Sequence, residues 1–111
     1  MNVSELGERE ILLFVGLARI VINADDVVSL AEMTYVRGLI DAIGRDRWHD
    51  LAQHARKFGG LDGLLDEARR IEHADSREVI LRELRAIAES DELVDSEEKM
   101  LQQLQTIWNP A

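Results

Sequence analysis

The feature that most restricts the fold is an apolar segment near the start of the sequence. Between residues 11 and 22 only Gly16 and Arg19 interrupt a run of aliphatic side chains, one phenylalanine and one alanine. Since an α-helix turns once every 3.6 residues, such a run covers every side of the cylinder. A helix that is apolar all round has to be buried, so this segment predicts a central helix covered by other elements.

The same segment also bears on membranes and on the cellular compartment. It is too short to span a bilayer, and it is preceded by acidic residues (Glu5, Glu8 and Glu10) where a secretory signal would have basic ones. The chain has no cysteine, so disulfides, thiolate metal sites and a cysteine nucleophile are excluded. We therefore expect a cytoplasmic protein with no direct membrane insertion.

The rest of the chain predicts helices and no strands. Apolar residues recur at spacings of three and four, there is one proline, and no run of β-branched residues alternates with polar ones. With 111 residues, 46% of them hydrophobic, the chain fits one domain spanning residues 1–111. The expected fold class is all-α, a compact bundle of about six helices at residues 4–23, 30–43, 47–58, 61–73, 76–89 and 96–108.

The fourth of these helices has two distinct faces. Its apolar stripe consists of Leu61, Leu64, Leu65, Ala68 and Ile71. The opposing polar set consists of Asp62, Asp66, Glu67, Arg69 and Arg70. This pattern predicts a surface helix whose charged residues face water.

Turn and capping residues indicate where helices begin and end. Gly44 is expected to end the second helix, and Gly59 with Gly60 to separate the third from the fourth. Three pairs match the capping box, in which a capping side chain precedes a glutamate by three residues: Ser29 with Glu32, Asp75 with Glu78, and Asp95 with Glu98.

Two segments of the chain resemble each other. Residues 19–32 align with residues 85–98, and the identical pairs are Arg19 with Arg85, Asp25 with Asp91, Val28 with Val94 and Glu32 with Glu98. Each segment reads as an apolar helix, a turn opened by an aspartate, two apolar residues and a capped helix. The alignment predicts an internal pseudo-repeat of two related helical hairpins.

This doubled pattern resembles the tellurite-resistance TerB family and its TerB-like relatives. The matching residues are Ala24, Asp25 and Glu32 in the first copy and Ser90, Asp91 and Glu98 in the second. Asp26 and Glu92 stand where the family usually has glycine. The resemblance implies a helical bundle of two related halves, an association with stress response, no enzyme activity, and acidic positions proposed to bind divalent cations.

Asp25, Glu32, Asp91 and Glu98 are therefore the candidate metal ligands. Carboxylate oxygens suit calcium, magnesium or manganese, and no other cofactor is expected. An EF-hand is excluded, because its third loop position would be Val27 or Leu93. The alternative is structural: the two glutamates complete capping boxes, and the two aspartates lie close to the positive ends of the following helices.

Charge and the remaining side chains limit the function further. The net charge of −9 disfavours nucleic-acid binding. The strongly acidic last quarter favours a protein partner, so the alternative function is a metal-independent adaptor that docks a basic partner on an acidic surface. His49 and His54 do not share a helix face, and the segment GlyGlyLeuAspGly at 59–63 lacks the lysine and strand of a phosphate-binding loop. We expect a non-catalytic binding module.

Overall fold

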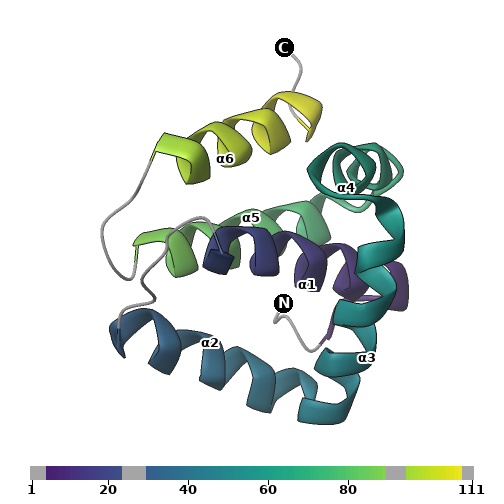
Figure 1. The fold of residues 1–111 in the computed structure, drawn as a ribbon. Coiled ribbons are helices and arrows are strands. Elements are labelled where there is room, and N and C mark those ends of the chain that lie inside the picture. The colour runs from purple at the N-terminus through teal and green to yellow at the C-terminus, as the bar shows by residue number, and fades with distance from the viewer. Residues whose placement is uncertain (1–4, 24–29, 90–94, 109–111) are drawn as a thin grey trace.

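In the computed structural model, residues 5–23, 30–89 and 95–108 are described, and within them the chain contains six α-helices and no strand. The helices are α1 (Glu8–Asn23), α2 (Leu30–Ile43), α3 (Arg45–Ala55), α4 (Leu61–Ala68), α5 (Ala74–Glu89) and α6 (Asp95–Trp108), with a 3-10 turn η2 (Arg56–Phe58) after α3. Figure 1 shows the bundle that they form. The predicted all-α fold class is confirmed.

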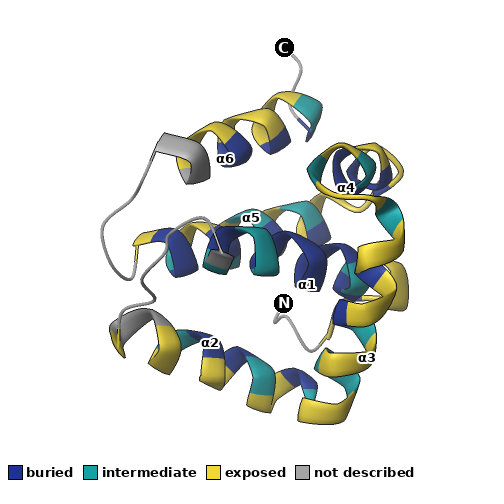
Figure 2. Cartoon of the chain, viewed as in Figure 1, coloured by how far each residue is buried: buried dark blue, intermediate teal, exposed yellow. Residues whose placement is uncertain are grey.

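Helix α1 is the centre of this bundle, as its sequence predicts. It packs against α3, α4 and α5, while α2 and α6 lie on opposite sides of the α1–α5 pair (Figure 1). Figure 2 shows α1 buried or partly buried beyond its first turn, whereas the other helices have exposed sides. The α1 side chains with no more than 1% exposure are Ile11, Leu13, Phe14, Val15, Leu17, Ala18 and Val21.

Helix α1 begins at Glu8, four residues later than predicted, because Gly7 caps it. The N–H of Gly7 donates to Oε1 of Glu10 at 2.8 Å, and the carbonyl of Gly7 accepts the N–H of Ile11 at 2.8 Å. This is the glutamate half of a capping box, with a glycine as the capping residue. The sequence pattern does not mark it, because no serine, threonine, aspartate or asparagine stands at that position.

A single glycine joins α2 to α3. The N–H of Gly44 donates to Ile40 at 2.7 Å, which ends α2 where predicted, and its carbonyl accepts the N–H of Trp48 at 2.8 Å, which starts α3. The φ of Gly44 is 105°, a conformation that L side chains rarely adopt. Because one residue serves both helices, α3 begins at Arg45, two residues earlier than predicted, and the chain bends sharply there. Gly59 and Gly60 separate η2 from α4, as predicted.

Helix α4 is five residues shorter than predicted. After Ala68 the backbone tightens, since the N–H groups of Arg70 and Ile71 bond carbonyls three residues back at 3.0 and 3.1 Å. The carbonyl of Ile71 accepts Nε of Arg77 at 2.7 Å, which ties this turn to α5. This tight turn takes the place of the last predicted residues of α4, so the helix ends at Ala68.

The predicted capping role of Asp75 is wrong. Helix α5 begins at Ala74, and the first carbonyl to accept a helical bond is that of His73, from the N–H of Arg77 at 3.1 Å. Asp75 therefore lies inside the first turn, where a negative charge still interacts favourably with the helix dipole.

Tyr35 fastens α2 to α5. Its hydroxyl donates to Oε2 of Glu83 at 2.5 Å, and Glu83 also pairs with Nε of Arg82 at 3.5 Å. Burial raises the pKa of Tyr35 to about 12, helped by the hydrogen bond to Glu83 and by its negative charge, and opposed by Arg82. The contact spans two helices that are far apart in sequence.

We expect the phenol of Tyr35 to titrate near pH 12. A phenol whose pKa rises from 10.0 to about 12 on folding contributes its full stabilisation below pH 10, and this is lost as the pH rises from 10 to 12. Tyr35 is the one tyrosine of the chain, so phenolate absorbance reports it alone. Tyr35→Phe should abolish the absorbance change and lower stability by about 1.5 kcal/mol at neutral pH. A titration midpoint near 10 would contradict the Tyr35–Glu83 contact.

Candidate binding groove

The predicted cation ligands are only partly within the described residues. Asp25 and Asp91 lie outside them, as do the side chains of Glu32, in the first turn of α2, and of Asp95, at the start of α6. Glu98 is in the first turn of α6 and is exposed. The first turns of α2 and α6 lie on opposite sides of the α1–α5 pair, so the turns that carry Glu32 and Glu98 do not meet (Figure 1).

Neither the cation site nor the pseudo-repeat is decided by this geometry. Within residues 5–23, 30–89 and 95–108 there is no group of three or more acidic or histidine side chains placed to hold a metal ion. Both aspartate turns and the pair Ser29 with Glu32 fall outside what is described. The cation site and the pseudo-repeat therefore remain predictions.

A melting experiment tests the cation prediction directly. If the four carboxylates bind calcium, magnesium or manganese in the folded state, millimolar ion raises the melting temperature by mass action. Asp25→Asn combined with Asp91→Asn should then remove the shift. A wild-type melting temperature that none of the three ions changes rules the site out.

A groove with a largely apolar lining lies near the surface between α2 and α3. Its volume is about 580 Å³, and its apolar lining comes from the end of α1, from α2 and from α3. These apolar residues are Ile22, Met33, Val36, Ile40 and Trp48. Trp48 forms the α3 wall, with its ring held edge-on against Phe14 in the core at a centroid distance of 6.5 Å and an angle of 83°.

The apolar face of α2 is wider than the part that the core covers. Val36, Leu39 and Ile43 point inward and are at most 9% exposed. Leu30 and Met33 are 83% and 47% exposed, and they are the exposed large hydrophobic side chains of the described chain. With Ile40 they follow helical spacing and form a second stripe of about 15 Å along α2, which we call the outer stripe (Leu30, Met33 and Ile40).

The described charged residues that line the groove are basic. They are Arg37 and Arg45, together with His49, and none of the lining residues in the described part of the chain is acidic. Both arginines are exposed, and neither takes part in an ion pair with another described residue. In a chain of net charge −9, such a pair of cations beside an apolar surface gives the groove a locally positive potential.

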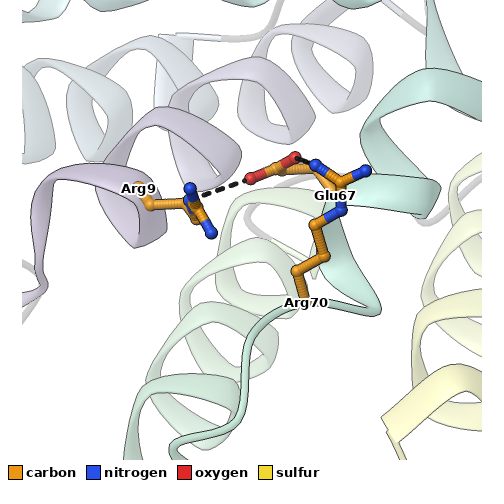
Figure 3. A network of polar contacts seen from close by, with 3 residues as sticks. All are labelled: Arg9, Glu67 and Arg70. Carbon is orange, nitrogen blue, oxygen red and sulfur yellow. Dashed lines mark hydrogen bonds and ion pairs between the residues drawn. The ribbon is translucent and has the colours of Figure 1, made fainter.

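A second opening, of about 600 Å³, lies between α1, α3 and α4, but its charges are already paired. Glu67 sits between two arginines, with Oε1 at 3.3 Å from Nε of Arg9 and Oε2 at 3.4 Å from Nη1 of Arg70 (Figure 3). Arg47 pairs with Glu8 in the same opening. Three arginines (Arg9, Arg47 and Arg70) and three carboxylates (Glu8, Asp50 and Glu67) line this opening, so it has little net charge to attract a ligand, and we interpret it as structural.

Glu67 was predicted to face water, and that prediction is wrong. Its side chain is 8% exposed, because the start of α1 passes beside α4 and Arg9 covers it. The sequence holds a weak signal of this, since Glu67 follows Leu64 by three residues and precedes Ile71 by four, at the edge of the apolar stripe. A buried carboxylate needs a cation, and the helical pattern alone does not reveal one supplied from α1.

The Glu67 network predicts a non-additive loss of stability. Arg9→Ala or Arg70→Ala alone should cost about 1 kcal/mol or less, since each arginine is about two-thirds exposed and the other one remains. The double variant leaves a buried carboxylate without a cation and should cost about 2 to 3 kcal/mol.

Urea unfolding of the two single variants and the double variant measures this coupling. Arg69→Ala is the control, because its pair with Asp66 is exposed on both sides and should contribute less than about 0.5 kcal/mol. Additive losses in the double variant would mean that Glu67 does not depend on these arginines.

Arg19, Arg85 and Trp108 make polar contacts within the bundle. Arg19 reaches from α1 to the carbonyl of Ala52 at 3.4 Å, and Arg85 pairs with Glu89 at 3.6 Å. Trp108 is buried, with its indole N–H on the carbonyl of Ala68 at 2.8 Å. His49, His54 and His73 are exposed.

Comparison of the chain with protein-family models, with curated proteins and with solved structures finds no match. The resemblance to TerB-like proteins therefore stays a prediction from the residues that carry it. Among the described helices, none combines the length and the apolar character that crossing a bilayer requires.

Proposed function

We propose that this chain is a non-catalytic, cytoplasmic binding module that accepts an amphipathic helix of another protein in the groove between α2 and α3. The observation that carries the proposal is the outer stripe, in which Leu30 and Met33 are exposed and Ile40 is half-buried, beside a groove lined by Val36 and Trp48. Helices dock in such grooves through apolar side chains spaced three and four residues apart. A role in binding rather than catalysis is what the TerB-like resemblance also implies.

A helix fits this surface better than a small molecule does. Small ligands are usually enclosed over most of their surface. Here the apolar surface runs out of the groove along three turns of α2 and ends at Leu30, which is 83% exposed. An elongated partner that lies along α2 covers both the groove and the outer stripe, whereas a compact ligand covers only the groove.

The position of Trp48 gives a direct test. In a Trp108→Phe background Trp48 is the sole tryptophan, so its emission reports the groove. A synthetic amphipathic helix with leucines at positions i, i+3, i+4 and i+7 should shift that emission with a saturable titration. Met33→Glu should abolish the shift, because it places a charge in the apolar contact.

Ala42→Glu is the matched control for that titration. It adds the same charge to an exposed position of α2 that does not line the groove, and it should leave binding unchanged. Loss of binding in both variants, or in neither, would place the contact elsewhere and overturn the proposal.

A further inference from the structure

We infer that the groove selects a partner helix whose apolar stripe is bordered by aspartate or glutamate side chains; this rests on the proposed function and states the chemistry of its partner. The alternative function predicted from the sequence is the opposite, a basic partner docking on the acidic last quarter. The charged residues that line this groove within the described part of the chain are Arg37 and Arg45, with His49 beside them, and the described lining includes no carboxylate.

The two arginines are placed to pair with such acids. Arg37 lies on α2 one turn after Met33 and three residues before Ile40, so it borders the outer stripe at its middle. Arg45 is the first residue of α3 and borders the groove at the end of α2. A helix lying along α2 would pass both guanidinium groups, each of which can hold a carboxylate by two parallel hydrogen bonds.

These arginines are also free of the internal pairing that occupies others. Arg9, Arg47, Arg69 and Arg70 each have a carboxylate partner, whereas Arg37 and Arg45 have none among the described residues. A cation kept unpaired beside an apolar surface, in a protein with 22 acidic residues, leaves a short-range positive potential for a ligand.

The two other occupants fit less well. An anionic membrane is repelled at long range by the net charge of −9, and the outward side of α2 carries Thr34, Asp41 and Ala42 where a membrane-surface helix would have lysine and arginine. A second copy related by a twofold axis through this face would bring like charges together, since each copy presents Arg37.

The experiment uses three fluorescently labelled peptides with one leucine stripe and flanking glutamate, glutamine or lysine residues. Anisotropy titration of the full chain should give the highest affinity for the glutamate peptide, about tenfold weaker binding of the glutamine peptide and weaker binding still of the lysine peptide. Charge reversal by Arg37→Glu with Arg45→Glu should invert this order.

The control is Arg56→Glu with Lys57→Glu, which changes the net charge equally at the far end of α3 and should keep the original order. Equal affinity for all three peptides would overturn the inference while the proposed function stands, and a lysine preference would do the same. If both double variants invert the order of the three peptide affinities, the order depends on net charge and not on the groove, and the inference is also overturned. No binding of any peptide would overturn both.

Two further measurements exclude the other occupants. When phosphatidylserine vesicles are sedimented, the chain should stay in the supernatant. In gel filtration, the elution volume of the chain should not depend on the protein concentration. Vesicle binding that Met33→Glu removes would mean that the groove binds a membrane instead of a partner helix. Self-association that Met33→Glu removes would mean that the groove binds a second copy of the chain.

Discussion

Gly63→Ala is expected to lower the free energy of unfolding by about 3 kcal/mol or more. A Cβ at this position would lie 1.8 Å from the carbonyl oxygen of Phe58 and 2.8 Å from its carbonyl carbon. Both are backbone atoms of η2, so relief requires α4 and η2 to move apart. Overpacking of this kind costs about 1 to 3 kcal/mol even where side chains can yield, and typical total stabilities are only about 5 to 15 kcal/mol.

Gly38→Ala is the control for Gly63→Ala. Gly38 lies inside α2, and a Cβ there has nothing within 4 Å. The better helix propensity of alanine should therefore raise stability by about 0.5 to 1 kcal/mol. Chemical denaturation of both variants gives the comparison, and a Gly63→Ala protein as stable as wild type would refute the close approach of η2 to α4.

Trp108→Ala is expected to have a similar effect, a loss of about 3 to 5 kcal/mol. Helix α6 packs against α4 and α5, and Trp108 at its end is 4% exposed. Removing the indole leaves a large cavity at this contact and takes away the hydrogen bond to Ala68. Helix α6 should lose protection against hydrogen exchange before the rest of the molecule.

Trp108→Phe separates packing from the hydrogen bond. The carbonyl of Ala68 still accepts the N–H of Ile71 at 3.1 Å, so it is not left without a partner. We expect a loss of about 1 kcal/mol for this variant, and less than about 0.5 kcal/mol for Gln105→Ala, which is exposed on the same helix. A Trp108→Phe variant as damaged as Trp108→Ala would show that the hydrogen bond dominates.

Local pattern was sufficient for much of the fold. The burial of α1 follows from its composition, and α2 spans the predicted residues because Gly44 can end it. The end of α4 was missed because it depends on Arg77, whose side chain reaches back from α5. Contacts between distant parts of the chain are not visible in helical periodicity.

The groove was missed for a related reason. Helical spacing alone does not separate Leu30, Met33 and Ile40 from the apolar residues of α2 that face the core. Together with Val36, Leu39 and Ile43, however, they span about half of the circumference of α2, which is wider than the apolar stripe of an ordinary surface helix. The width of that arc was the available signal. Which part of it stays uncovered depends on the sharp turn at Gly44, and that is a property of the folded chain.

The central position of α1 also determines the order in which this protein can fold during synthesis. Helix α1 packs against α3 and α4, which follow soon, and against α5, which leaves the ribosome about 50 residues later. At about 5 to 20 residues per second, the α5 side of this apolar helix waits several seconds for its cover. Until then the nascent chain exposes Ile11, Phe14 and their neighbours to solvent, an apolar surface that chaperones can bind and on which unrelated nascent chains can aggregate.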